Sequence, residues 1–136
     1  MARWAGVPKD RSVAAAERWI AGERRRRAAG LVIDLVICRL GAEPEVLGEV
    51  GLVMVGRARR WAEAGWWLTS GARGAGRAAA ALRLITPWAQ EALRLDRLFA
   101  RTDPANRAAG GVAERAGWRP AGTTSDGRLL WVPQRR

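Results

Sequence analysis

The run Arg73-Gly74-Ala75-Gly76-Arg77-Ala78 has the residue types and spacing of an anion-binding loop. An apparent strand, Ala62–Leu68, precedes it, and an alanine- and leucine-rich helix follows it. A glycine-rich turn between a strand and a helix points backbone N–H groups outward at the positive end of the helix dipole, where a phosphate binds well. Gly74 and Gly76 lack a Cβ, so the backbone can approach a ligand closely. An ordinary strand-to-helix turn would show the same short pattern.

The loop matches neither of the two common nucleotide-binding motifs. The dinucleotide fingerprint needs a third glycine at a fixed offset and a following acidic residue, and both are missing. A P-loop needs Gly-Lys-Ser or Gly-Lys-Thr, which occurs nowhere in the chain. Any phosphate bound here would therefore belong to another class of cofactor.

Composition narrows the chemistry further. The 136 residues suffice for one domain, which we take as 1–136, with a single core. The chain has no histidine, and Cys38 is the sole cysteine, so histidine-based triads are excluded and no metal site is expected. The sequence lacks a long apolar run and a signal-peptide pattern, so we expect a cytoplasmic protein that does not bind a membrane.

The net charge of +11 comes almost entirely from arginine and invites a nucleic-acid interpretation. The arginines are scattered, however, except at Arg24–Arg27 near the end of the first expected helix. There they would complement the helix dipole at its C-terminus. We favour a solvated helix end, with the 3′-phosphate of a nucleotide cofactor or RNA as alternative contacts.

Periodicity and turn residues predict the order α-β-β-β-α-β-α-β-β. The first helix would run from a Ser12 cap to Ala29, and the second would contain Pro87, which should kink it. Trp19, Trp88 and Trp131 are expected in the core. The expected strands are Leu31–Leu40, Val46–Arg57, Ala62–Leu68, Asp96–Arg101, Trp118–Thr123 and Arg128–Val132.

Five short motifs in order resemble the GNAT superfamily of acyl-CoA N-acyltransferases, most closely its Rim-type branch, which acetylates ribosomal-protein N-termini. The motifs are Gly48-Glu49-Val50-Gly51-Leu52, Ala62-Glu63-Ala64-Gly65-Trp66-Trp67-Leu68, Arg73–Ala78, Asp103-Pro104-Ala105-Asn106 and Glu114-Arg115-Ala116-Gly117-Trp118. The resemblance implies an α/β domain of the α+β type, with a mixed, mostly antiparallel central sheet flanked by helices. GNAT domains usually begin with one more strand and helix, so the chain is expected to be shortened at its start and to lack the first strand. An edge left unpaired in this way would suit a homodimer.

The resemblance also implies how acetyl-CoA would be held. The strand before the loop diverges from the next one, and the pantetheine arm lies in the gap, with an oxyanion donor near the Trp67 backbone. For Asn106 the resemblance implies a bond to the pantetheine, while the residue pattern predicts a plain helix N-cap. The cofactor-binding residues implied are Trp66, Trp67, Leu68, Arg73, Gly74, Ala75, Gly76, Arg77, Ala78 and Asn106.

A carboxylate must accept the proton of the acceptor ammonium, directly or through water. Glu63 is our first candidate for this catalytic base, and Glu49 on the neighbouring strand is the second, although either could be a surface carboxylate paired with an arginine. No acid can be assigned to the departing thiolate. The chain has no tyrosine, and Ala109 stands where Rim-type relatives carry a serine.

The leading hypothesis is an N-acetyltransferase that moves an acetyl group from acetyl-CoA to a primary amine, on a protein N-terminus or a small molecule. A shortened CoA-binding protein without catalysis is the second hypothesis, because the tyrosine and serine are missing. A basic RNA- or ribosome-associated module is the third, and nucleic acid is the least favoured partner.

Overall fold

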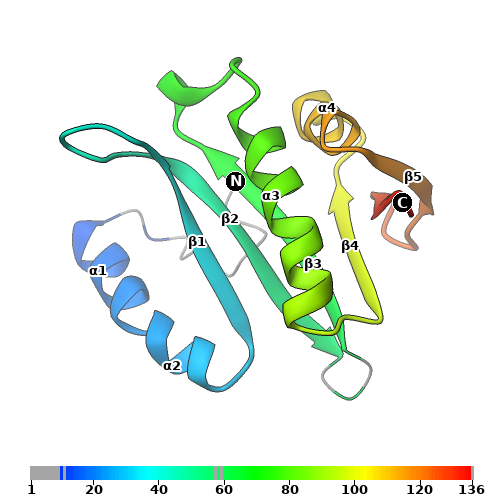
Figure 1. Cartoon of the computed structure of the whole chain (residues 1–136), viewed down its shortest axis with the longest axis horizontal. Helices are drawn as coiled ribbons and strands as arrows, with labels where there is room; N and C mark the ends of the chain where they lie inside the picture. Colours follow the sequence, from blue (N-terminus) through cyan, green and yellow to red (C-terminus); the bar gives the residue numbers. More distant parts are fainter. Residues whose placement is uncertain (1–9, 11, 57, 59, 136) are drawn as a thin grey trace.

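The computed structural model describes residues 10, 12–56, 58 and 60–135, which form one mixed sheet flanked by helices (Figure 1). The six strands of this described part lie in the order β1-β2-β3-β4-β6-β5. All neighbouring pairs are antiparallel except β3 and β4. The strands are β1 Val32–Arg39, β2 Glu45–Gly56, β3 Trp61–Leu68, β4 Arg97–Thr102, β5 Trp118–Thr123 and β6 Leu129–Pro133. The predicted fold class is confirmed, and so are the six predicted strands in their order along the chain.

The helices cover both faces of the sheet. Side chains alternate between the two faces of a strand. Arg26 and Arg27 contact Asp34 on one face of β1, whereas Leu35 and Ile37 point to the other face and line a hollow with α3. The helices of the described residues are α1 Val13–Ala21, α2 Glu23–Ala28, the short 3₁₀ helix η2 Ser70–Ala72, α3 Arg77–Ala92 and α4 Arg107–Arg115.

The prediction of one continuous helix from Ser12 to Ala29 is wrong, because Gly22 divides this segment into α1 and α2. Glycine weakens a helix interior through its backbone freedom. Gly22 also leaves room for Arg26, since a Cβ at this position would lie 2.8 Å from the Arg26 guanidinium. Arg26 folds back over Gly22, donates to the Trp19 carbonyl at 2.9 Å and stacks 4.7 Å from the centre of the Trp19 ring. The predicted cap is confirmed, since Ser12 accepts from the Ala15 backbone at 3.1 Å.

Helix α3 continues through Pro87, as the unbroken apolar period predicted. Proline removes one backbone donor from a helix. The Thr86 hydroxyl, next to the proline, donates to the Leu82 carbonyl at 2.6 Å and accepts from the Trp118 indole at 3.2 Å. These bonds attach this part of α3 to β5.

The core lies between α3 and the sheet and extends to α4. It includes Leu52 and Leu82, which are fully buried, and Trp131, whose indole donates to Thr102 at 2.9 Å. Trp131 confirms its predicted core position. The same prediction was wrong for Trp88, which is 45% exposed because it lines an open hollow between α3, β1 and β2.

Strand β1 is the first strand of the sheet in the described part of the chain. The predicted lack of an earlier strand concerns residues 1–9, which lie outside the described residues. Among the helices that the structure describes, none is long and apolar enough to cross a membrane.

Candidate active site

Strands β3 and β4 start as neighbours and then separate. Parallel pairing covers only Trp61 with Arg97, Ala62 with Leu98 and Glu63 with Phe99. Beyond Glu63, β3 stays paired with β2 as far as Leu68, while β4 pairs with β6. The β4-facing side of β3 is therefore open from Ala64 onward. The divergence that the resemblance implied is present.

Gly48 on β2 allows the end of β3 to pair closely with β2. It lies opposite Leu68, and a Cβ on Gly48 would come within 2.1 Å of the Trp67 carbonyl oxygen. A glycine is needed here for the close approach of the two backbones, not for a left-handed conformation. The backbones of β2 and β3 therefore approach each other closely at the end of β3.

The glycine loop joins the open end of β3 to α3. Gly74 and Gly76 have φ values of +85° and +71°, which L side chains rarely adopt. No described atom lies within 4 Å of a Cβ built on either residue, so the loop faces open space. Gly76 is the N-cap of α3, and no described side chain caps this helix or places an acidic group in its first turn. The positive helix end is therefore available to an anion.

A groove of about 570 Å³ lies between β3, the glycine loop, α3 and α4. Every cofactor-binding residue implied by the resemblance lines it, except Ala75. Arg77 donates to the Ala72 carbonyl at 3.0 Å, which fixes its side chain beside the loop. Ala109, which stands at the position of the serine of Rim-type relatives, also lines the groove, together with residues that we did not predict: Ala79, Ala108, Val112 and Arg115. All of these except Ala79 come from α4, which the sequence signalled only through Asn106 and Ala109.

Asn106 is the N-cap of α4 and lies in the groove wall. Its side-chain carbonyl accepts from the Ala109 backbone at 3.2 Å, which confirms the predicted cap. The cap uses only the acceptor half of the amide, so the NH₂ half is the part that could donate to a ligand. The two roles considered for Asn106 are therefore compatible.

Glu63 is held by Arg101 at the point where β3 and β4 separate. The Arg101 guanidinium donates to Oε1 at 2.8 Å and to Oε2 at 2.7 Å. Only 12% of the Glu63 side chain is exposed. This bond to Glu63 raises the pKa of Arg101, opposed by partial burial. A carboxylate held in this bidentate geometry is well placed to fix the two strands.

Glu49 lies on the same sheet face, next to the open part of β3. It is opposite Trp67, and its Oε2 accepts from the Trp67 indole at 3.3 Å. Only 6% of Glu49 is exposed. Burial, and then the charge of nearby Asp34, raise the pKa of Glu49 to about 7. Asp34 on β1 also has a raised pKa, mainly because of burial.

The comparison with protein families decides the identity of this arrangement. The model of the GNAT acetyltransferase domain matches residues 1–119. The chain belongs to the GNAT acetyltransferase family. No curated protein is similar enough to this GNAT domain to count as a match.

Solved structures agree with the family. A Vibrio cholerae structure designated a ribosomal-protein-serine acetyltransferase has a TM-score of 0.79 at 19% identity, covering 90% of this chain and 76% of its own. Mycobacterium smegmatis RimJ in complex with CoA-disulfide has a TM-score of 0.74 at 26% identity, covering 88% of this chain and 61% of its own. Spermidine N-acetyltransferase from Vibrio cholerae, in complex with CoA and spermine, has a TM-score of 0.72 at 15% identity, covering 92% of this chain and 77% of its own. The Rim-type resemblance is confirmed at the level of the fold.

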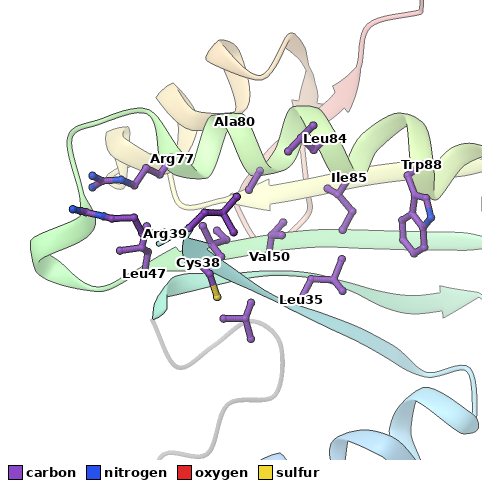
Figure 2. Close-up of a pocket in the computed structure, with 14 residues that line it drawn as sticks. Leu35, Cys38, Arg39, Leu47, Val50, Arg77, Ala80, Leu84, Ile85 and Trp88 are labelled. Atoms are coloured by element: carbon purple, nitrogen blue, oxygen red, sulfur yellow. The ribbon is translucent and has the colours of Figure 1, made fainter. Parts of the chain in front are cut away.

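The GNAT domain has a second hollow, of about 700 Å³, between β1, β2 and α3 (Figure 2). It is mostly apolar, with Arg39 and Arg77 at one end and Trp88 at the other. Cys38 lies here and not in the groove beside β3. Except for Arg77, none of the predicted cofactor residues lines this hollow, so the motifs point to the β3 groove.

Sequence reasoning missed two residues of the site. Arg101 was read only as the end of a strand, and Asp34 as an alternating strand residue. A buried aspartate in an otherwise apolar strand is the one signal that could have identified Asp34. Nothing local in the sequence links Arg101 to Glu63, because their contact depends on the parallel pairing of β3 and β4.

Proposed function

We propose that this GNAT domain transfers an acetyl group from acetyl-CoA to a primary amine by direct attack, with no covalent enzyme intermediate. The observation that carries the proposal is the early separation of β3 and β4, which opens a groove lined by the predicted cofactor residues. Direct transfer is favoured because Cys38, the one cysteine of the chain, lies outside this groove.

The groove offers acetyl-CoA a strand-like position beside β3. The uncapped start of α3 and the left-handed glycines would hold the pyrophosphate through backbone N–H groups. The pantetheine arm would lie along Trp66, Trp67 and Leu68, where backbone groups of β3 face away from β2. A backbone N–H near Trp67 would stabilise the oxyanion that forms when the amine attacks the carbonyl carbon.

Glu49 fits the role of catalytic base better than Glu63, our first candidate from sequence. Both oxygens of Glu63 are bound by Arg101, so Glu63 could take up a proton only by giving up part of this ion pair. Glu49 has a pKa of about 7, which suits proton transfer near neutral pH. In the proposed reaction Glu49 takes the ammonium proton, directly or through water, and the neutral amine forms the C–N bond. The C–S bond then breaks, and the second proton lost by the nitrogen goes to solvent.

The CoA thiolate would leave without a protein acid. Ala109 lines the groove where the resemblance implied a serine, and it offers only a methyl group. A thiol has a pKa of about 8.5, so the thiolate is a good leaving group and can take a proton from solvent. This avoids the need for the missing tyrosine.

For the acceptor we keep the two alternatives expected from sequence, a protein N-terminus and a small-molecule amine. One related structure is designated a protein-serine acetyltransferase, and another acts on spermidine. We propose a protein N-terminus or a small-molecule amine as the acceptor, with the domain acting as a monomer or a homodimer.

Release of CoA thiol from acetyl-CoA, measured with a panel of peptides bearing free N-termini and a panel of polyamines, tests this function. We expect acceptor-dependent release that Glu49→Gln reduces by about 100-fold, a typical contribution of a general base. Glu63→Gln should keep most of the rate constant if it remains folded. Saturable acetyl-CoA binding without turnover on any acceptor would instead support the non-catalytic hypothesis.

A further inference from the structure

Two acidic side chains from adjacent strands meet beneath the α1–α2 layer. In the β1–β2 pairing, Asp34 is opposite Gly51 and Val36 is opposite Glu49, so both carboxyl groups point to the same face. Gly51 has no side chain to separate them. A Cβ there would lie 3.1 Å from Asp34 Oδ1, so the Asp34 carboxyl occupies that space. The sheet therefore brings Asp34 beside Glu49.

The hydrogen bonding of this pair is incomplete. Only 7% of the Asp34 side chain and 6% of Glu49 are exposed. Among the described residues, Asp34 Oδ1, Asp34 Oδ2 and Glu49 Oε1 have no hydrogen-bond partner. Buried polar atoms are nearly always satisfied, so three such oxygens in one cluster need an explanation.

The surrounding charged groups do not provide hydrogen-bond partners for these three oxygens. From α2, Arg26 approaches Asp34 Oδ2 only to 3.9 Å, and its guanidinium donates to the Trp19 carbonyl. Arg27 donates to the Asp34 backbone carbonyl and to Glu23, the other charged group of α2 that acts on Asp34. From β3, Trp67 donates to Glu49 Oε2 alone. Two neighbouring buried carboxylates would thus face one guanidinium beyond hydrogen-bond distance.

We propose that Asp34 and Glu49 share one proton, carried on Glu49 Oε1 and donated to the Asp34 carboxylate, and that Asp34 is thereby a positioning residue for the catalytic base. Two carboxylates can only accept, whereas a carboxylic acid can also donate, so one proton gives Glu49 Oε1 and one of the two Asp34 oxygens a partner. Arg26 stabilises the remaining charge on Asp34, the member of the pair that it approaches.

The shared proton gives the pair a role in transfer. With the proton released, the pair carries two negative charges and can accept one proton from the acceptor ammonium. With the proton bound, the pair carries one negative charge and one internal hydrogen bond. Like charges at short distance favour retaining one proton, as in other carboxylate pairs. This role in transfer rests on the proposed function, whereas the shared proton itself does not.

The test is a titration of the Glu49 carboxyl group by ¹³C NMR or infrared difference spectroscopy, in the whole protein without any ligand. In the wild type, one carboxyl group should titrate near pH 7, and this signal should be lost in Glu49→Gln. In Asp34→Asn the titration should move down by about one pH unit, because a neighbouring negative charge is removed. In Arg26→Gln it should move up, because a positive charge is removed.

Asp96→Asn is the matched control. It removes another aspartate, paired with Arg60 at the start of β4, and should leave the Glu49 titration in place. Should Asp34→Asn fail to fold, the wild-type and Arg26→Gln titrations still decide the question. An ordinary glutamate titration for wild-type Glu49, or an unchanged one in Asp34→Asn, would overturn the shared proton.

The pH profile of kcat/KM separates this inference from the proposed function. If the base role holds, the acidic limb of the profile moves with the Glu49 titration in both Asp34→Asn and Arg26→Gln. A merely structural role for Asp34 would lower the rate without moving the limb. A shifted titration with an unmoved limb would keep the shared proton and reject Glu49 as the base.

Discussion

Glu63 and Arg101 form a bidentate ion pair, at 2.8 and 2.7 Å, across the point where β3 and β4 separate. Glu63 belongs to the last paired position of the two strands, and Arg101 lies two residues beyond its partner Phe99. The pair therefore links the strands just as their backbone bonding ends. The contact gives Glu63 a structural role, while the catalytic role expected of Glu63 from sequence stays a prediction.

Glu63→Gln and Arg101→Gln should each lower the free energy of unfolding by about 1–3 kcal/mol, since each breaks charge-assisted hydrogen bonds of a largely buried pair. The double variant should lose less than the sum, giving a coupling energy above about 0.5 kcal/mol. Denaturant unfolding of the four proteins measures this. Strictly additive losses would mean that the two side chains do not stabilise each other.

Gly48→Ala should destabilise the domain by at least about 2 kcal/mol, because overpacking against fixed backbone is costly. The added methyl group would lie 2.1 Å from the Trp67 carbonyl oxygen, which cannot move without disturbing β3. Gly71→Ala is the control, since its Cβ would meet no described atom within 4 Å. Thermal unfolding of both variants compares them, and equal stability would contradict the close packing of β2 on β3.

Stability should depend on pH through Glu49. Its pKa is about 7 in the folded protein, against an ordinary value of 4.5 for a glutamate, so the folded state holds the proton more tightly. Its stabilising contribution is therefore complete below about pH 4.5 and is lost as the pH rises through 7. Relative to Glu49→Gln, the wild type should lose about 3 kcal/mol of unfolding free energy over this window. Parallel pH curves for the two proteins would contradict the raised pKa.

The sequence predicted the strands and the glycine loop well because these depend on local patterns. Mainly apolar stretches between turn residues predicted β2 and β3. The spacing of Gly74 and Gly76 predicted the loop, where both glycines have left-handed φ values. The groove followed from the family resemblance, since the motif order already implied diverging strands. Asn106 showed both its capping pattern and its place in the groove.

Features set by tertiary packing were not predictable in the same way. The break at Gly22 depends on Arg26 reaching back to Trp19, and the exposure of Trp88 depends on the hollow that it lines between α3 and the sheet. The sequence allowed an arginine partner for Glu63 but could not identify Arg101, because parallel pairing joins positions far apart in the chain. Asp34 and Glu49 became a pair only through the register of β1 on β2.

Acetyl-CoA binding by the β3 groove is most directly tested by thermal unfolding with and without acetyl-CoA, in the wild type, Gly74→Glu and Gly127→Glu. Both glycines have a positive φ and open space around them, at +85° and +83°, so the two variants carry matched backbone strain and charge. Only Gly74 lines the groove. At 100 times the dissociation constant, a ligand that binds only the folded state adds about 2.7 kcal/mol of stability. We predict a clear rise in Tm for the wild type and Gly127→Glu, and a strongly reduced rise for Gly74→Glu. No rise in the wild type, or an equal rise in all three proteins, would contradict the assignment of this groove to acetyl-CoA.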